Sequence, residues 1–275
     1  MTIKKTERDV VDYTDSPITI GGLKHDFENL KITSGSVIIM HSSLSKIGWV
    51  VGGAIAVIKA MVDILTPEGT LIMPTFSGDN SEPSYWQNPP VPQKWWEIVR
   101  KNMPAYHPDI TPTRGLGIIP EVFRKWPKVI RSGHPSLSFS AWGKHAKYIT
   151  KNHHIGVDLG EDSPLSRIYS LNGKIILIGV THENNTSLHL AEYRSDFPNK
   201  EYRLAGAAIQ GKQGRRWIEW EELNINSDDF EKLGTDFEEN YNIQKGKVGL
   251  ADTRVILQRE IVDFAEEWLK KNRGN

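Results

Sequence analysis

The residues best suited to chemistry lie in the segment 174–194, KIILIGVTHENNTSLHLAEYR. It contains His189, and Glu192 follows three residues later, one helical turn away on a similar face. An imidazole that stays neutral near pH 7 can take a proton from a substrate. We therefore predict that His189 is a general base. A histidine that caps a helix or fills a polar gap is the alternative.

The residues around His189 predict how it is positioned. Residues 175–178 form a short apolar run bounded by glycine, which is typical of a buried strand. A polar turn follows, in which Asn185 or Thr186 can cap a helix that begins at Ser187. His189 then lies in the first helical turn beyond a strand, where open α/β sheets bind their ligands. The positive end of the helix dipole disfavours imidazolium there.

Two glycine-containing loops precede predicted helices, at residues 42–53 (SSLSKIGWVVGG) and 113–117 (TRGLG). Glycine lets the backbone approach a ligand closely, and free N–H groups at a helix start bind phosphate. The first loop matches neither GxGxxG nor a P-loop, so a plain tight turn is an equal alternative. For the second loop, a helix cap with a surface arginine at Arg114 is the alternative.

Other polar clusters give weaker indications. His134 is a second candidate for a functional histidine, with a packed turn histidine as its alternative. Glu219 and Glu221 are predicted to share one strand face, with tryptophans opposite, although an exposed edge strand explains them as well. The remaining histidines considered lack a convincing set of partners, so we predict no metal site. They are His153, His154 and His182.

The hydrophobic periodicity predicts one α/β domain over residues 1–275. A strand at 36–40, a helix opened by the glycines at 48 and 52–53 with an apolar face from Val51 to Leu65, and a strand at 70–73 are typical of a parallel β-α-β unit. Residues 75–112, rich in Pro, Trp, Asp and Asn, form a long insertion of the kind that is usually functional. The other expected elements are helices at 20–30, 94–101, 115–125, 163 onward, 228–239 and 261–269, a strand at 137–142, and a hairpin of 204–209 with 216–220.

The composition narrows the possible function. The 275 residues carry no net charge and have a pI near 7.1, which argues against binding nucleic acid through bulk charge. No apolar run approaches the ~18–20 residues that span a bilayer, and residues 1–15 have no apolar core, so we expect a cytoplasmic protein without membrane contact. There is no cysteine and no GxSxG motif, which excludes a thiol nucleophile and leaves a serine hydrolase unsupported.

Six motifs together resemble the aminoglycoside 3-N-acetyltransferase family, its Bacillus-type members most closely. In chain order they are HSSLSKIGWVVGGAIAVIKA, PT, TPTRGLGIIPEVFR, RSGHPSLSFSAWG, LGEDSPLSRIY and NTSLHLAEYR. The resemblance covers residues 18–270 and implies a single α/β/α sandwich with a mixed central sheet. It also implies transfer of acetyl from acetyl-CoA to the 3-amino group of a deoxystreptamine aminoglycoside. The absence of cysteine and of a serine elbow favours direct transfer in a ternary complex. An enzyme of the same fold for another amine, and a protein that only binds aminoglycoside or CoA, are the alternatives.

The resemblance also assigns roles to residues. It implies that His189 is catalytic and that Glu219, Glu221 or Glu222 supports it. The implied coenzyme-binding residues are Ser42, Ser43, Leu44, Gly48, Val50, Val51, Gly52, Gly53, Thr113, Arg114, Gly115 and Leu116. The insertion falls where the acceptor pocket is built, and Asp79, Glu192 and Glu221 are the expected partners of a cationic acceptor. No metal is implied, and a monomer or a homodimer is expected.

Overall fold

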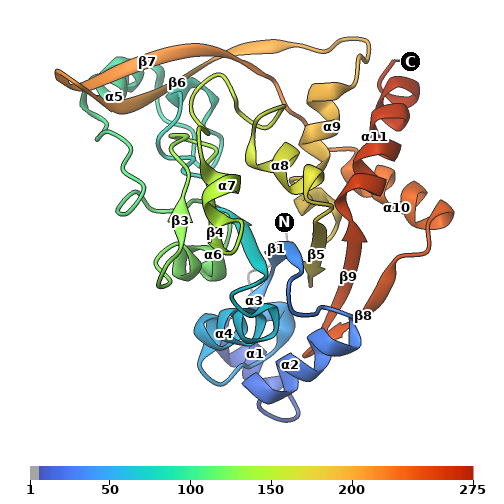
Figure 1. Ribbon diagram of the computed structural model, residues 1–275. Coiled ribbons are helices and arrows are strands. Elements are labelled where there is room, and N and C mark those ends of the chain that lie inside the picture. The colour runs from blue at the N-terminus through green and yellow to red at the C-terminus, as the bar shows by residue number, and fades with distance from the viewer. Residues whose placement is uncertain (1–5, 275) are drawn as a thin grey trace.

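A mixed seven-stranded sheet dominates residues 6–274, the part of the chain that the computed structural model describes (Figure 1). Its strand order is β3-β4-β2-β1-β5-β9-β8. The strands are β1 (Val37–Ser42), β2 (Thr70–Pro74), β3 (Ile130–Arg131), β4 (Phe139–Gly143), β5 (Lys174–Ile178), β8 (Gln244–Val248) and β9 (Ala251–Leu257). The central strands β2, β1 and β5 are parallel, as their apolar runs predict. The predicted mixed α/β sandwich is therefore confirmed.

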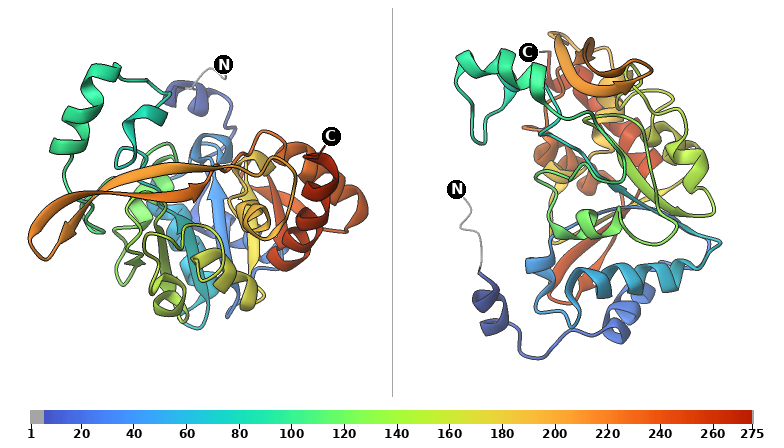
Figure 2. Two further views of the ribbon diagram at one scale, coloured as in Figure 1. Left: turned by 90° about the horizontal axis from the view of Figure 1, so that it is seen from above. Right: turned by 90° about the vertical axis from the view of Figure 1, so that its left-hand side faces the viewer.

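Helices cover both faces of this sheet (Figures 1 and 2). On one face Ile38 and Met40 of β1 pack among α2, α4 and α6, and on the other face Ile39 packs among α7 to α11. The helices are α2 (Ile20–Asn29), α3 (Leu44–Ile47), α4 (Gly53–Leu65), α5 (Trp96–Asn102), α6 (Ile118–Phe123), α7 (Ala146–Thr150), α8 (Pro164–Ser170), α9 (Leu188–Arg194), α10 (Phe230–Asn240) and α11 (Gln258–Asn272). Helix α6 begins three residues later than predicted, because Gly115 and Gly117 have φ angles of 75° and 80°.

The antiparallel outer strands were only partly expected. β4 pairs antiparallel with β2, and β9 pairs antiparallel with β5 and with β8. The β8–β9 hairpin, like the short strand β3 and helix α7, was missed by the sequence analysis. β8 reads QKGKV, and its charged, exposed positions carry little of the alternation that indicates a strand.

The insertion and a second, two-stranded sheet lie together at one end of the molecule. β6 (Tyr202–Gly211) and β7 (Gly214–Leu223) form the predicted hairpin, which extends out beside α5 (Figures 1 and 2). Asn80 both donates to and accepts from the backbone of Ala208, and Arg215 donates to the carbonyl oxygens of Arg100 and Met103. The insertion is otherwise built from α5 and two short 3₁₀ turns, η1 (Pro83–Tyr85) and η2 (Gln93–Trp95).

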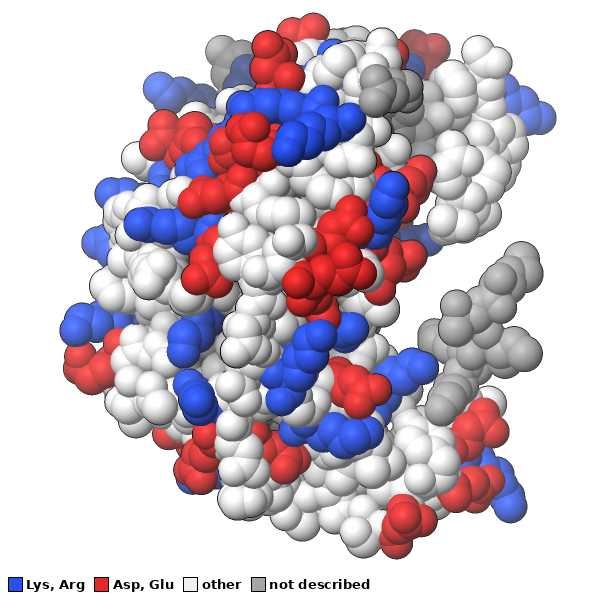
Figure 3. Space-filling view, turned by 90° about the vertical axis from the view of Figure 1, so that its right-hand side faces the viewer, with Lys and Arg blue, Asp and Glu red and all other residues white. Residues whose placement is uncertain are grey.

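The N-terminal region, for which the sequence predicts no element before residue 20, contains α1 (Glu7–Asp12). Thr6 and Asp9 form a capping box, and the Tyr13 hydroxyl donates to the carbonyl oxygen of Ser45. Residues 1–5, part of the segment 1–15 that has no apolar core, lie outside the described residues. None of the helices in the described part is both long and apolar enough to cross a membrane. On the face with α10 and α11, acidic and basic side chains are interspersed (Figure 3).

Gly234 fixes the contact between α10 and η3 (His182–Asn184), the 3₁₀ turn before α9. A Cβ on Gly234 would lie 2.0 Å from Cγ of the buried His182 ring. Gly234→Ala should lower the free energy of unfolding by roughly 1–3 kcal/mol through overpacking, despite the better helix propensity of alanine. Urea denaturation measures it.

Gly21→Ala is the matched control, because its Cβ would meet nothing nearer than Thr19 Oγ1 at 3.9 Å. It should be neutral or stabilising by up to about 1 kcal/mol. Equal stability of Gly234→Ala and the wild type would show that the His182 ring moves aside freely.

Candidate active site

A cavity of about 640 Å³ lies at the carboxyl ends of β1, β2 and β5. The chain passes from β1 to β2 on one side, and β5 lies on the other, which is where open α/β sheets bind ligands. The lining comes from α1, the end of β1 with the loop 42–53, the start of α6 and the segment after β5. A cavity of about 300–1,000 Å³ suits a small-molecule ligand.

The first predicted loop forms one wall of this cavity. The lining includes Ser42, Ser43, Leu44, Gly48, Val50 and Gly53. Gly53 has φ of 54°, and no atom lies within 4 Å of the position of an added Cβ. Val51 and Gly52 were also predicted but are not part of the lining. Gly52 instead adopts the left-handed conformation at the N-cap of α4.

The second predicted loop contributes only in part. Gly115 and Leu116 line the cavity, whereas Thr113 and Arg114 do not. Thr113 donates to Glu121 from its backbone N–H at 2.9 Å and from its hydroxyl at 3.0 Å. Arg114 forms an ion pair with Asp79 at 2.9 Å and donates to the carbonyl oxygen of Asn88.

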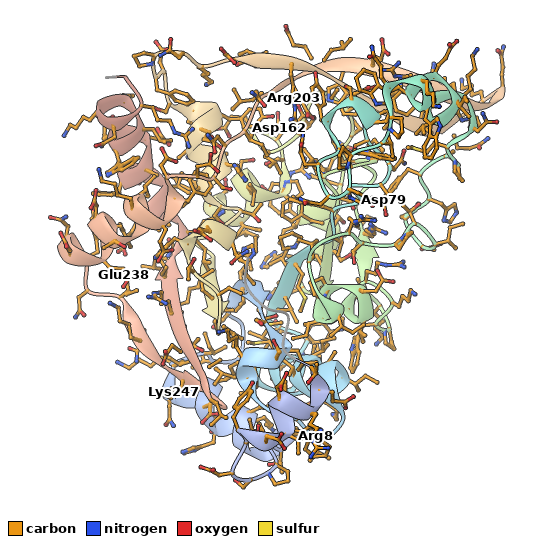
Figure 4. The ribbon with its side chains drawn as sticks, turned by 180° about the vertical axis from the view of Figure 1, so that it is seen from behind. Arg8, Asp79, Asp162, Arg203, Glu238 and Lys247 are labelled. Atoms are coloured by element: carbon orange, nitrogen blue, oxygen red, sulfur yellow. The ribbon has the colours of Figure 1, made fainter. Side chains whose placement is uncertain are left out.

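This ion pair alters the predictions for both of its partners. Arg114 was expected to face a coenzyme phosphate, and Asp79 a cationic acceptor. Their charges oppose each other, and both side chains are at least half exposed. Figure 4 shows Asp79 on the insertion side of the molecule, away from Glu238 on α10. Neither charge is free for a ligand in this conformation.

His189 lies in the first turn of α9, as predicted. The helix begins at Leu188 with Ser187 as N-cap and without a side-chain cap, so neither Asn185 nor Thr186 caps it. Nδ1 of His189 lies 2.5 Å from Oε2 of Glu192, and the two side chains are 12% and 1% exposed. Because a carboxylate accepts hydrogen bonds, the proton sits on Nδ1 and Nε2 is left as a base.

Glu192 is held ionised although it is buried. Burial by itself would raise its pKa, but His189, the guanidinium of Arg273 and the backbone N–H of Asn226 together hold the pKa below its usual value. Its Oε1 accepts from Arg273 at 2.5 Å and from the Asn226 N–H at 3.0 Å. Glu192 was predicted to bind the acceptor, yet its oxygens are occupied by these three groups.

The predicted hairpin carboxylates lie elsewhere. Glu219 and Glu221 are exposed, and Glu219 accepts from Nε1 of Trp217 at 3.3 Å. Trp217 therefore shares a face with Glu219, contrary to the prediction, because residues two apart on a strand point the same way. Glu222 is buried and pairs with Arg203 at 2.8 Å. The carboxylate bonded to His189 is Glu192, and the structure pairs none of the hairpin carboxylates with it.

His41, the buried imidazole at the end of β1, was not among the predicted site residues. It lines the cavity, and its Nε2 has no hydrogen-bond partner among residues 6–274. Burial, with a smaller effect from the nearby His189, lowers its pKa to about 3. His41 is therefore neutral at physiological pH. Its position at the carboxyl end of an apolar strand was the available signal.

His134 is locked by its neighbours. Its Nε2 lies 2.9 Å from Oδ1 of Asp158, and its Nδ1 accepts from the Leu137 N–H at 3.0 Å. Its ring is fully buried and stacks on His153 at 5.0 Å. The packed-turn alternative therefore describes it. Within the described chain, no group of three or more His, Asp or Glu side chains is arranged to hold a metal ion.

Comparison with known proteins assigns the chain to a family. The model of the aminoglycoside 3-N-acetyltransferase family matches residues 39–270. The chain belongs to this family. The family match starts inside β1 and ends in α11, so it includes the cavity loops, the insertion and His189.

Individual family members are similar over nearly the whole chain. The SPbeta prophage-derived aminoglycoside N(3')-acetyltransferase-like protein YokD of Bacillus subtilis is 44% identical over 264 residues, 96% of each chain. Its crystal structure gives a TM-score of 0.93 over 97% of this chain and 98% of that one. Aminoglycoside N(3)-acetyltransferase VII of Streptomyces paromomycinus is 31% identical over 95% of this chain and 94% of its own length. A binary complex of AAC-IIIb with CoASH is 27% identical, with a TM-score of 0.84 over 94% of this chain and 99% of that one.

Glu121 anchors the cavity loop of this family member, and its ionisation should stabilise the fold. Burial would raise its pKa, but Arg124, Thr113 and Lys125 outweigh burial and hold the pKa at about 2. The stabilisation is therefore complete above the ordinary glutamate pKa and is lost as the pH falls through about 2. Glu121→Gln should lower the free energy of unfolding at pH 7 by roughly 1–3 kcal/mol, and less at pH 3.

Urea denaturation at several pH values between 3 and 7 measures this difference. Glu28→Gln, on an exposed position of α2, is the control and should change little at any of them. A Glu121→Gln deficit of the same size at pH 3 and pH 7 would contradict the ionic account.

Proposed function

We propose that this enzyme transfers acetyl from acetyl-CoA to the 3-amino group of a deoxystreptamine aminoglycoside, directly and within a ternary complex. The observation that carries the proposal is the His189–Glu192 pair, which does not itself line the cavity but lies near His41, a lining residue at the sheet edge. Family membership supports the reaction, and the names of the relatives support the acceptor class. The CoA complex of AAC-IIIb supports the donor.

The cavity suits a coenzyme that carries phosphate and a flexible thiol arm. Hydroxyl groups of Ser43 and Ser45 lie beside each other at 3.3 Å, and glycines allow close approach of the backbone on two walls. The unpartnered Nε2 of His41 supplies a buried polar group that a ligand can satisfy. In this proposal acetyl-CoA runs from residues 43–53 toward His189.

An aminoglycoside amine is mostly protonated near neutral pH and must lose a proton before it attacks a thioester. Nε2 of His189 accepts this proton, and Glu192 fixes the tautomer and stabilises the imidazolium that forms. The amine nitrogen then bonds to the thioester carbonyl carbon and the carbon–sulfur bond breaks. The remaining excess proton of the nitrogen goes to the departing sulfur, so that CoA leaves as the free thiol. No cysteine is present to carry an acyl group, which favours direct transfer.

The acceptor is proposed to bind between the insertion and the hairpin. Glu219 and Glu221 are exposed on β7 and can meet the other ammonium groups of the substrate. Asp79 serves this role only if its ion pair with Arg114 opens. An acceptor that is a different amine would use the same base, so a panel of amines distinguishes the two possibilities.

The coenzyme placement is tested by a charge at Gly53, which lies at the start of α4 on the cavity wall. Gly53→Asp should weaken acetyl-CoA binding about tenfold or more, because its carboxylate repels phosphate. Asp and Asn both tolerate the left-handed conformation, and the site has room for either.

Gly53→Asn therefore has nearly the same shape without the charge, and its affinity should stay within about threefold of the wild type. Isothermal titration calorimetry with acetyl-CoA compares the two. Wild-type affinity in Gly53→Asp would show that the phosphates bind elsewhere.

The reaction is tested by mass spectrometry of kanamycin, gentamicin and neomycin after incubation with acetyl-CoA. The wild type should add one acetyl group and release free CoA thiol. His189→Ala should lower kcat by ~10²–10⁴ and retain its acetyl-CoA affinity, because only the base is lost.

Two carboxylate variants refine the result. Glu192→Gln should reduce kcat more than Glu219→Gln, because Glu192 is bonded to His189 and Glu219 is not. If His189→Ala keeps most of its activity, another group is the base. If no acceptor gains an acetyl group, the proposed activity fails.

A further inference from the structure

One arginine that follows α11 contacts Glu192, the carboxylate bonded to the proposed base. Arg273 follows α11 directly as its C-cap residue. Its guanidinium donates to Oε1 of Glu192 at 2.5 Å, to both carboxylate oxygens of Asp229 at 2.7 and 2.6 Å, and to the carbonyl oxygen of Asn226 at 2.6 Å. It therefore joins α9, the segment before α10 and the end of α11.

Aromatic rings enclose this guanidinium. Arg273 lies over Phe197 at 5.1 Å and over Phe230 at 5.9 Å, and its side chain is only 12% exposed. The Phe230 ring also lies 5.0 Å from the His189 ring. Low exposure and several hydrogen bonds hold the planar group in one orientation, which a surface ion pair does not achieve.

The orientation of the Arg273 guanidinium matters because the two carboxylate oxygens of Glu192 have different partners. Arg273 and the Asn226 N–H occupy Oε1, so that Oε2 is directed to Nδ1 of His189. A carboxylate free to rotate would offer either oxygen and would leave the imidazole less well placed. A small misplacement of a catalytic group is enough to lower a rate strongly.

We propose that Arg273 is a positioning residue, which acts through Glu192 to orient His189 and to set the pH at which the base is ready. This inference deepens the proposed function and rests on it.

The charges around the pair determine the direction of the effect. Charged and titratable groups around the pair include His41 on β1, Lys200 after α9 and Arg273, and Asp229 forms an ion pair with Arg273 behind it. A cation beside the pair opposes the uptake of a further proton, and an anion favours it. Loss of Arg273 should therefore make the pair hold a proton up to a higher pH, and loss of Asp229 should do the opposite.

Arg273→Met removes the positive charge and the forked N–H donors of the guanidinium. Its side chain still fills the apolar space between Phe197 and Phe230. We expect kcat to fall about tenfold or more, and the acid limb of the kcat/KM profile to move to higher pH by about one unit. Affinity for acetyl-CoA, measured by calorimetry, should not change. Arg273→Lys keeps the positive charge but loses the planar set of guanidinium donors. The acid limb of its pH profile should therefore stay near that of the wild type, while its kcat is still reduced.

Asp229→Asn is the opposing variant, and its acid limb should move to lower pH. A general loosening of the structure would lower the activity of both variants. It would not move the acid limb to higher pH in Arg273→Met and to lower pH in Asp229→Asn. Arg259→Met is the matched control, because Arg259 lies on the same helix, and it contacts Tyr169 instead of the pair. It should match the wild type in kcat and in pH profile.

A titration that needs no acetyl transfer separates this inference from the proposed function. The imidazole signal of His189 is followed by NMR against pH, and it is assigned by its loss in His189→Gln. Its midpoint should rise in Arg273→Met and fall in Asp229→Asn. These shifts in a protein that acetylates no acceptor would refute the proposed function and leave the role of Arg273 intact.

The inference would be overturned if Arg273→Met and Asp229→Asn both kept the wild-type midpoint of the His189 titration and the wild-type pH profile of kcat/KM. If Arg273→Met does not fold, the Asp229→Asn and Arg273→Lys variants decide it. A midpoint in Asp229→Asn that stays or rises would then count against the role of Arg273, as would a wild-type kcat in Arg273→Lys.

Discussion

The buried carboxylate of Glu192 is the constraint on which the site depends. A carboxylate at 1% exposure is costly unless hydrogen bonds and opposite charge surround it. Its partners come from its own helix, from a loop 34 residues away and from an arginine 81 residues away. The proposed base is therefore completed only when the last helix has packed against the body, and local helix formation alone does not orient it.

The parts of this arrangement that could be predicted are those encoded locally. Apolar runs such as 175–178 identify the buried parallel strands, and glycine with small polar residues identifies the cavity loop 42–53. His189 follows from its place just beyond a strand. Six motifs in the right order identified the family. In each case a few consecutive residues carry the information, because parallel strands and helix starts have characteristic sequences.

The parts that failed depend on pairs distant in sequence. Glu192 was noted one helical turn from His189, but its bond to Arg273, 81 residues away, has no sequence signal, and the partner of His189 was sought on the hairpin instead. Asp79 and Arg114 were given separate ligands, although they neutralise each other across 35 residues. Periodicity shows which face of an element is apolar, but not which charges meet when the elements pack. His41 was overlooked because its place in the cavity lining depends on how β1 packs with segments distant in sequence.

The proposed coenzyme and acceptor half-sites are held in place by different parts of the structure. The cavity wall is attached to the parallel core, with Ser43 bonded to the carbonyl oxygen of Ile178 and Glu121 holding the second loop. The acceptor wall is held instead by bonds between the insertion and the hairpin, with Ala208 bonded to Asn80 and to Tyr106. A change in the hairpin can therefore reshape the acceptor wall without moving the strands that carry the cavity. Such a division lets one coenzyme site serve different acceptors, because specificity resides in segments outside the core.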